Sequence, residues 1–364
     1  GLVNYDFNLG KDHTFKILAG IERISAAAMS IDAFRRGFIS TTIDQLYAGA
    51  DEDKDNSGSA DQSARFNYFG RINYDFLQKY LLEFVWRYDG SYIFPESGRF
   101  GFFPGISAGW RVSDENFWKN SLAFVNYFKL RASWGQTGND RIDEYQYLSS
   151  FGFGSTTFIT NSSLENKTLT ELRIANPNVT WEVANQSNIG FDAEFLDGKI
   201  QLSAEYFYNL RTNILTYRNA SVPVSTGLKL PRENIGKVAN QGFEVQAGYR
   251  GAAGDFTYEV SANLAYARNK ILFWDETPGI PEYQKSTGMP MNAGLYYEAI
   301  GIFKDQDAID AYPHWTDARP GDIIFRDVNE DDKIDGLDKV RYDKTSIPTL
   351  TGGMDIHLSF KNFY

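Results

Sequence analysis

The sequence predicts an all-β fold, an antiparallel sheet that forms part of a transmembrane β-barrel, and three observations support this prediction. Apolar and polar residues alternate with a period of two in about eleven segments. Short and long connections alternate between these segments. Aromatic residues make up 16% of the 364-residue chain although its mean hydropathy is −0.40, which is expected when apolar side chains are confined to one face of each strand.

The segment 80–91 shows the alternation clearly. Its apolar residues on one face are Tyr80, Leu82, Phe84 and Trp86. Glu83 and Arg87 belong to the other face of the same strand. We expect the apolar face to contact outer-membrane lipid and the two charged residues to face the lumen. The opposite register would place charges at mid-membrane, which costs about 2–4 kcal/mol for a basic residue and less for an acidic one.

Eleven strands are expected from such segments, each bounded by turn or loop residues. They span residues 2–9, 13–24, 64–75, 80–91, 101–112, 126–137, 182–195, 199–217, 238–250, 255–269 and 350–361. Helix is nearly absent from the prediction. One short helical turn is expected after Ser113, where Ser-Asp-Glu-Asn offers an N-cap and an acidic first turn before Phe117 and Trp118.

The connections separate a membrane barrel from a soluble sandwich. Short or moderate ones are 10–12, 76–79, 112–124, 196–198 and 251–254, and long ones are 25–63, 90–100, 138–181, 218–237 and 270–349. Outer-membrane barrels have short periplasmic turns and long extracellular loops. The alternation therefore predicts a single partial barrel domain over residues 1–364, with the long connections outside the cell.

The longest connection, 270–349, is expected to be extracellular as a whole. It contains a predicted local β-hairpin around Leu295–Phe303, which is not a membrane crossing, and an acidic Asp-x-Asn-x-Asp segment. Eleven strands is an odd number, whereas bacterial single-chain barrels have even numbers. The chain also starts inside an expected strand and stops where a turn is expected. We therefore interpret it as part of a larger barrel, because a sheet edge cannot lie open in lipid.

Composition excludes several classes of function. The chain has no Cys and only three His, which argues against disulfide scaffolds, thiol nucleophiles, iron–sulfur clusters and His-rich metal centres. No organic cofactor is expected. The net charge of −11, without a basic run, argues against nucleic-acid binding. A G-x-S-x-G match around Ser107 lies inside an expected strand and not at a strand-to-helix turn, so no catalytic residue is expected.

Several sequence blocks spread over nearly the whole chain are specific in combination. In chain order they are Tyr88-Asp89-Gly90-Ser91, Arg99-Phe100-Gly101, Phe103-Pro104, Ser107-Ala108-Gly109-Trp110-Arg111, the run from Lys129 to Asn139, Asn234-Ile235-Gly236-Lys237-Val238, Gln241-Gly242-Phe243-Glu244, Pro320-Gly321-Asp322 and the run from Asp327 to Asp335. With these blocks the chain resembles the C-terminal part of the barrel of SusC/RagA-type TonB-dependent outer-membrane transporters, without the plug.

This resemblance implies a barrel of about 22 strands in the outer membrane of a Gram-negative bacterium. It implies TonB-dependent uptake of a nutrient with no bond made or broken, and therefore no enzyme. The implied ligand is a glycan or oligosaccharide in the first place and a peptide in the second. The implied partners are TonB, contacted through the plug, and a SusD-like surface lipoprotein. The alternative from another class is a soluble β-rich carbohydrate-binding or glycan-processing module.

One loop motif predicts cation binding from its own spacing, which is that of an EF-hand-like calcium loop. The oxygen-bearing side chains are Asp327, Asn329, Asp331, Asp335 and Asp338, and Lys333 is expected to contribute its backbone carbonyl. Asp332 stands where such loops have Gly. Residues 305–343 hold twelve acidic and five basic residues, so a solvated acidic loop without an ion is the alternative. Ca²⁺ in a structural role is the expected cofactor, because it accepts oxygen ligands in irregular geometry.

Aromatic residues in the predicted extracellular loops are the candidate contacts for a ligand. The residues selected are Tyr92, Phe94, Tyr312 and Trp315, and Phe151, Phe153 and Phe158 share the property. Such rings stack on sugars or pack the loops themselves. Packing is expected for most of them, because large loops need small cores of their own.

Overall fold

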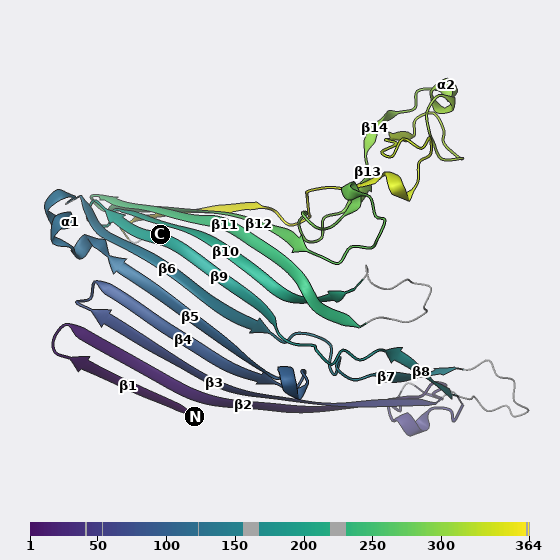
Figure 1. Ribbon diagram of the computed structural model, residues 1–364, viewed down its shortest axis with the longest axis horizontal. Helices are drawn as coiled ribbons and strands as arrows, with labels where there is room; N and C mark the ends of the chain where they lie inside the picture. The colour runs from purple at the N-terminus through teal and green to yellow at the C-terminus, as the bar shows by residue number, and fades with distance from the viewer. Residues whose placement is uncertain are drawn as a thin grey trace, which may run out of the picture.

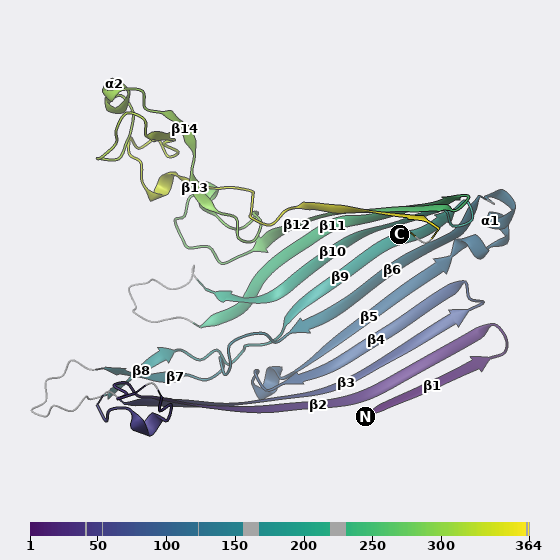
Figure 2. The ribbon, with the colours of Figure 1, turned by 180° about the vertical axis from the view of Figure 1, so that it is seen from behind.

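The computed structural model of the chain describes residues 1–40, 42–52, 54–122, 124–155, 167–218, 231–361 and 363. Its main feature is an eleven-stranded antiparallel sheet with the order β1-β2-β3-β4-β5-β6-β9-β10-β11-β12-β17. Figures 1 and 2 show these strands side by side as one curved wall. Strands that follow one another in the sheet also follow one another along the chain, so the wall is an up-and-down meander.

The predicted all-β class and all eleven predicted strands are confirmed. The sheet strands are β1 (Leu2–Leu9), β2 (His13–Phe34), β3 (Asp55–Phe76), β4 (Tyr80–Ser91), β5 (Phe100–Arg111), β6 (Val125–Asn139), β9 (Glu182–Phe195), β10 (Ile200–Tyr217), β11 (Arg232–Ala253), β12 (Phe256–Phe273) and β17 (Leu350–Phe360). The expected loop over 25–63 is wrong in part. Strands β2 and β3 stay paired as far as Phe34 and Asp55, so only 35–54 connects them.

The connections sort to two ends of the sheet, as the alternation of their lengths predicts. Tight turns at 10–12, 77–79, 196–199 and 254–255 and the segment with helix α1 lie at one end, which we call the turn end. The longer connections after β2, β4, β6, β10 and β12 lie at the other end, which we call the loop end (Figure 1).

The smaller elements lie in these connections. They are η1 (Leu46–Ala48), η2 (Glu96–Gly98), η3 (Val112–Asp114), α1 (Asn116–Ser121), β7 (Ser150–Ser155), β8 (Lys167–Arg173), η5 (Glu282–Gln284), β13 (Leu295–Tyr297), β14 (Ala299–Ile302), α2 (Gln306–Asp310), β15 (Ile323–Phe325), η6 (Gly336–Asp338) and β16 (Lys339–Arg341). Among the described residues no helix is long and apolar enough to cross a membrane.

The predicted helical turn after Ser113 is present, but its start differs from the prediction. Helix α1 begins after Glu115, whose side chain makes no capping hydrogen bond, and Ser113 is buried in the preceding turn η3. The carboxylate of Glu115 instead accepts hydrogen bonds from the Tyr80 hydroxyl at 2.7 Å and the Trp110 indole at 3.3 Å. Contacts with neighbouring strands therefore decide the position of this helix.

The segment between β12 and β17 stays outside the large sheet. Strand β13 pairs with β16 and strand β14 pairs with β15, so Leu295–Phe303 does not form the expected hairpin by itself. Its two short strands are each completed by a segment that follows helix α2 in the chain. We call residues 295–341 the loop module, and Figures 1 and 2 show it standing beyond the loop end of β12.

The strand register gives the sheet an apolar face and a polar face, because residues paired across antiparallel strands lie on the same face. One row of paired residues runs through all eleven strands of the apolar face. It consists of Phe7, Phe15, Tyr74, Leu82, Ala108, Ala132, Ile189, Tyr206, Phe243, Tyr266 and Leu350. Glu83 and Arg87 lie on the polar face, opposite to Leu82, as predicted.

Two clusters of buried apolar residues lie near the loop end. The larger consists of Ile93, Phe94, Phe103, Val179 and Trp181, and the smaller of Ile214, Val238 and Ile271. Phe103 pairs with Arg87 across β4 and β5, so the larger cluster lies on the polar face of the sheet. It packs part of the long connection between β6 and β9 against the wall.

Candidate functional site

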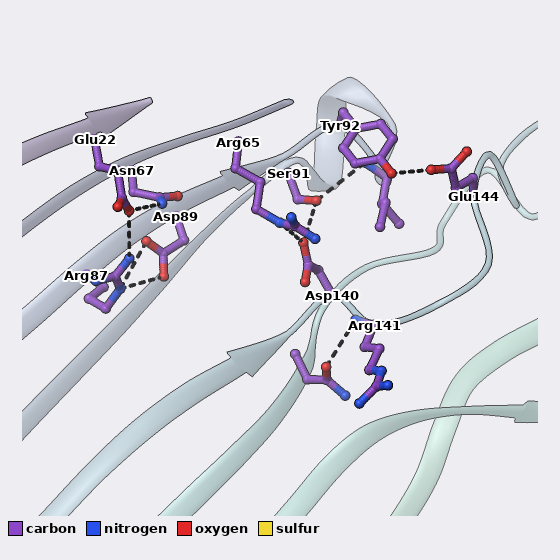
Figure 3. Close-up of polar contacts among 12 residues, drawn as sticks. Glu22, Arg65, Asn67, Arg87, Asp89, Ser91, Tyr92, Asp140, Arg141 and Glu144 are labelled. Atoms are coloured by element: carbon purple, nitrogen blue, oxygen red, sulfur yellow. Dashed lines mark hydrogen bonds and ion pairs between the residues drawn. The ribbon is translucent and has the colours of Figure 1, made fainter. Parts of the chain in front are cut away.

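Charged and amide side chains on the polar face form a network over β2, β3 and β4, which Figure 3 shows. The Arg87 guanidinium lies 2.9 Å from Asp89 and 4.0 Å from Glu22. The Asn67 amide donates a hydrogen bond to Glu22 at 2.9 Å. The Arg87 guanidinium also lies 5.5 Å from the ring centre of Phe69. This part of the polar face therefore presents both positively and negatively charged side chains to a bound molecule.

A second set of contacts ties the connection after β6 to the end of the wall (Figure 3). Asp140 accepts hydrogen bonds from Arg65 Nε and from Ser91 Oγ, both at 2.7 Å. The hydroxyl of Tyr92 donates to the Glu144 carboxylate. This hydrogen bond, together with burial, raises the pKa of Tyr92 to about 12. The long connection is thus held at two points next to the network of Arg87.

A third group of charges lies farther toward the turn end of the polar face. Arg131 forms ion pairs with Glu205 and, at 3.5 Å, with Asp192. Ser203 donates a hydrogen bond to Asp192 at 2.9 Å. Arg131 also lines a hollow of about 660 Å³, together with other polar side chains such as Glu83. The polar face can therefore bind a hydrophilic solute through many weak hydrogen bonds.

The structure places two of the aromatic candidates in the packed cluster at the loop end. Phe94 is completely buried, with its ring centre 5.0 Å from that of Trp181, so it packs the loops and does not present a surface to a ligand. Tyr92 packs against the same cluster and holds Glu144 through its hydroxyl. Phe151 is exposed, the side chain of Phe153 is not described, and Phe158 lies outside the described residues.

The other two aromatic candidates lie in the loop module. The Trp315 indole donates to the Ile334 carbonyl at 3.0 Å and its ring packs against Tyr297 and Phe325. Trp315 nevertheless keeps 45% of its surface exposed, beside a pocket of about 390 Å³. Tyr312 accepts a hydrogen bond from the Asp327 backbone at 3.1 Å, which joins it to the acidic motif.

The acidic motif folds as a compact loop in which backbone N–H groups bind the carboxylates. Asp327 accepts from the backbone of Asp331 at 3.3 Å and of Asp332 at 2.9 Å. Asp338 is completely buried and accepts from Val328 at 2.9 Å and from Asp335 at 2.7 Å. Asp335 in turn accepts from the Leu337 backbone, and Asp331 from the Asn329 amide and the Lys333 backbone.

These carboxylates lie near one another. Burial and then the negative charges of Asp338, Asp331, Asp335 and Asp327 raise the pKa of Tyr283, whose hydroxyl donates to the Leu337 carbonyl. In the described part of the chain, no group of three or more His, Cys, Asp or Glu side chains is arranged to hold a metal ion. The oxygen donors are the type that Ca²⁺ prefers, and the predicted cation site stays a prediction.

The comparison with known families is decisive for the fold. The family described as TonB dependent receptor-like, beta-barrel, matches residues 1–326. The chain belongs to this family. Its sheet is therefore a section of a TonB-dependent receptor barrel, in which the apolar face contacts lipid and the polar face lines the lumen.

Individual TonB-dependent receptors support this assignment. The chain is 29% identical to TonB-dependent receptor P26 of Formosa agariphila, over 99% of this chain and 37% of P26. It is 27% identical to TonB-dependent receptor SusC of Bacteroides thetaiotaomicron, over 85% of this chain and 31% of SusC. A solved structure of the RagAB peptide transporter matches with a TM-score of 0.80 and 21% identity, over 99% of this chain and 39% of that chain. The chain thus spans less than two fifths of these proteins.

The comparisons test four predictions made from the sequence. The resemblance to SusC/RagA-type transporters is confirmed, and the wall belongs to the outer membrane of Gram-negative bacteria. The relatives are named receptors and transporters and not enzymes. The alternative of a soluble carbohydrate-binding or glycan-processing module is wrong, because the family match over residues 1–326 covers ten of the eleven strands of the large sheet, from β1 to β12.

The sequence did not reveal the residues that hold the loop end together. Asp140 and Glu144 lie in a segment without periodicity, and their partners Arg65 and Tyr92 are far away in the chain. Trp181 lies directly before β9 in the predicted loop. A large aromatic residue at the border of a strand indicates that the residue is packed against other side chains. The sequence does not show which side chains these are.

Proposed function

We propose that this chain forms part of the wall of an importer that takes up a glycan across the outer membrane, driven by TonB and assisted by a SusD-like surface lipoprotein. The ligand crosses unchanged, so the proposal needs neither a catalytic residue nor an organic cofactor. The polar face is the observation that carries the proposal, because it lines a hollow of about 660 Å³ with hydrogen-bonding side chains.

The chemistry of the wall and of the loop module suits a sugar. Hydroxyl groups of a sugar both donate and accept hydrogen bonds, and the network of Arg87, Asp89, Asn67 and Glu22 supplies both kinds of partner. In the loop module, the exposed part of Trp315 offers an apolar surface beside a pocket that Asp317 and Asp322 also line. An aromatic ring next to carboxylates can stack on a sugar ring and bind its hydroxyls.

A peptide is the second candidate ligand. The solved structure with a TM-score of 0.80 is described as a peptide transporter. Charges of both signs on the polar face, such as Arg131 and Glu205, would also suit the termini and charged side chains of a peptide. The two candidates differ in one measurable respect, because binding of a neutral oligosaccharide depends less on ionic strength than binding of a charged peptide.

The test uses the intact transporter purified with its surface lipoprotein. Binding of neutral oligosaccharides and of short peptides is measured by calorimetry at low and high salt. The proposal expects oligosaccharide binding that salt changes little, and about tenfold weaker binding in a Trp315→Ala variant. Phe117→Ala is the control, since Phe117 is also an exposed aromatic but lies at the turn end. If peptides bind and oligosaccharides do not, the proposed glycan ligand is wrong and the ligand is a peptide.

We also propose that the acidic motif binds one structural Ca²⁺. Asp327, Asn329, Asp331 and Asp335 would supply side-chain oxygens and Lys333 its carbonyl. Asp338 is already bound to two backbone N–H groups and would contribute mainly charge. The loop bends in a way that suits such a site, because Asp332 adopts a φ of +61° at the position where calcium loops have Gly.

A further inference from the structure

The pocket of the loop module differs in composition from the hollow on the polar face of the wall. Its lining includes the rings of Phe303, Trp315 and Phe325 and the carboxylates of Asp317 and Asp322. Among the described residues no Lys or Arg lines it, whereas Lys16, Lys129 and Arg131 line the hollow of the wall. Its volume of about 390 Å³ lies within the range of about 300–1,000 Å³ that is usual for small-molecule sites.

Backbone hydrogen bonds place the two acidic residues beside the aromatic rings. Trp315 and Asp317 belong to one tight turn, 315–318, which a backbone hydrogen bond of 2.9 Å closes. The Phe303 N–H donates to the Asp322 carbonyl at 2.9 Å, so Asp322 lies next to the residue that supplies the buried ring of the pocket. Each carboxylate is therefore fixed to a segment that also carries an aromatic side chain of the pocket.

The hydrogen-bond donors on the lining side chains are already engaged within the loop module. The Trp315 indole N–H donates to the Ile334 carbonyl at 3.0 Å. Nδ1 of His314, which also lines the pocket, lies 2.8 Å from the Tyr312 carbonyl, and it carries the proton because a carbonyl only accepts. In the neutral ring Nε2 is then an acceptor, like the oxygens of the two carboxylates. The remaining polar atoms of the lining side chains are therefore all acceptors.

The surroundings of the pocket are also negative. Residues 305–343 hold twelve acidic and five basic residues. Such an excess of one charge raises the local concentration of ligands with the opposite charge. The face of an aromatic ring also attracts a cation that lies within about 6 Å of its centre. A positively charged group on a ligand is thus favoured by the carboxylates, the rings and the loop module as a whole, and a sulfate or carboxylate is repelled.

We propose that this pocket recognises a sugar unit with a free, protonated amino group, so that the imported glycan contains amino sugars. This inference rests on the proposed uptake of a glycan and specifies its chemical class. An ammonium group has three donors and no acceptor, which matches a pocket whose available side-chain atoms are acceptors. A hydroxyl group uses only its donor there, and an N-acetyl group carries no charge. The sugar ring stacks on the exposed part of Trp315 while the ammonium donates to Asp317 and Asp322.

The test measures binding of two matched trisaccharides to the intact transporter purified with its surface lipoprotein. One is a linear trimer of glucosamine with protonated amines, and the other is the same trimer with N-acetylated, neutral amines. Calorimetry at low salt should show about tenfold tighter binding of the amine trimer, and high salt should remove most of this preference.

The outcomes separate this inference from the proposed function. If neutral oligosaccharides bind and the amine trimer binds no more tightly than the acetylated one, the inference alone is overturned. If no oligosaccharide binds, neutral ones included, the proposed uptake of a glycan is overturned and the inference with it.

A matched pair of variants locates the preference in this pocket. Asp317→Asn removes one carboxylate charge, and folding should not change because Asp317 makes no hydrogen bond or ion pair within the described part of the chain. We expect the preference for the amine trimer to fall several-fold. Asp307→Asn is the control, because Asp307 is also an exposed residue of the loop module but does not line the pocket. It removes the same charge and should leave the preference unchanged.

A second substitution strengthens the effect. Asp322→Asn added to Asp317→Asn removes the other carboxylate charge, while the amide oxygen can still accept the hydrogen bond that the Arg319 backbone donates at 2.8 Å. The double variant should bind the two trimers with nearly equal affinity. An undiminished preference in the double variant, or an equal loss in Asp317→Asn and Asp307→Asn, would overturn the pocket as the site of recognition.

Discussion

Arg65 and Asp140 are 75 positions apart in the chain, and the Arg65 Nε lies 2.7 Å from an Asp140 carboxylate oxygen. Arg65 belongs to β3, and Asp140 is the first residue after β6. Asp140 also accepts a hydrogen bond from Ser91 at the end of β4. Because this carboxylate is mostly buried and has two donors, it fixes the direction in which the long connection leaves the wall.

The first prediction concerns this anchor. Asp140→Ala leaves the Arg65 guanidinium and the Ser91 hydroxyl without their shared acceptor, which costs about 1–3 kcal/mol. We expect faster cleavage of residues 140–150 by protease in the intact transporter, while barrel insertion is unchanged. Asp51→Ala is the control, because Asp51 is 82% exposed and its ion pairs contribute little. Equal cleavage rates in the two variants would show that the anchor does not hold the loop.

The second prediction is a pH dependence of the contact between Tyr92 and Glu144. The hydrogen bond and burial raise the pKa of Tyr92 from 10.0 to about 12, so the folded state favours the protonated phenol. The contact therefore contributes its full stability below pH 10 and loses it as the pH rises from 10 to about 12. Protease sensitivity near residue 144 should rise in this window. Tyr92→Phe should be sensitive already at neutral pH and should lack the transition.

The sheet could be predicted from the sequence because the alternation of apolar and polar residues lies within each strand. A strand that has lipid on one side and the lumen on the other must alternate, and all eleven segments with this alternation are strands. The pattern fails where the strands leave the membrane. The extension of β3, Asp55–Ser63, has only small and polar residues on both faces, and the extension of β2 alternates only from Met29 to Asp32, which is too short a run to predict a strand.

The candidate site could be predicted only where spacing decides it. The acidic motif is local, and its compact loop follows from residues within twelve positions of one another. The partners of Asp140 and Glu144 depend on how the chain returns to the wall, and no short-range pattern contains that information. Exposure also depends on tertiary packing, since Phe94 is buried whereas Trp315 is partly exposed, although both are aromatic residues of loops.

The third prediction concerns residues 1–364 expressed alone without detergent. Strands β1 and β17 each pair with one strand only, and the apolar face exposes large side chains such as Leu82, Ile189 and Met354. Open edges and a broad apolar surface favour association. We expect aggregates in plain buffer, detected by light scattering, and soluble protein in detergent. A monomer with a sharp, reversible unfolding transition in plain buffer would contradict this prediction.

The fourth prediction is the effect of Ca²⁺ on the loop module. If the acidic motif binds the ion, millimolar Ca²⁺ should protect residues 320–343 of the intact transporter from protease, and Mg²⁺ should protect less because it demands near-octahedral geometry. Asp327→Ala removes a proposed ligand and should abolish the protection while barrel insertion stays intact. Asp338 is less suitable for this test, because its side chain holds the backbone of Val328 and Asp335 even without an ion.

Asp332→Gly is the matched variant for this experiment. Asp332 has a φ of +61°, a left-handed conformation that costs a side-chain-bearing residue about 1–2 kcal/mol and costs glycine nothing. The substitution also places Gly where calcium loops have it. We therefore expect protection by Ca²⁺ at the same or a lower concentration than in the unaltered protein. Loss of protection in Asp332→Gly, or no protection by millimolar Ca²⁺ in the unaltered transporter, would leave the solvated acidic loop as the correct interpretation.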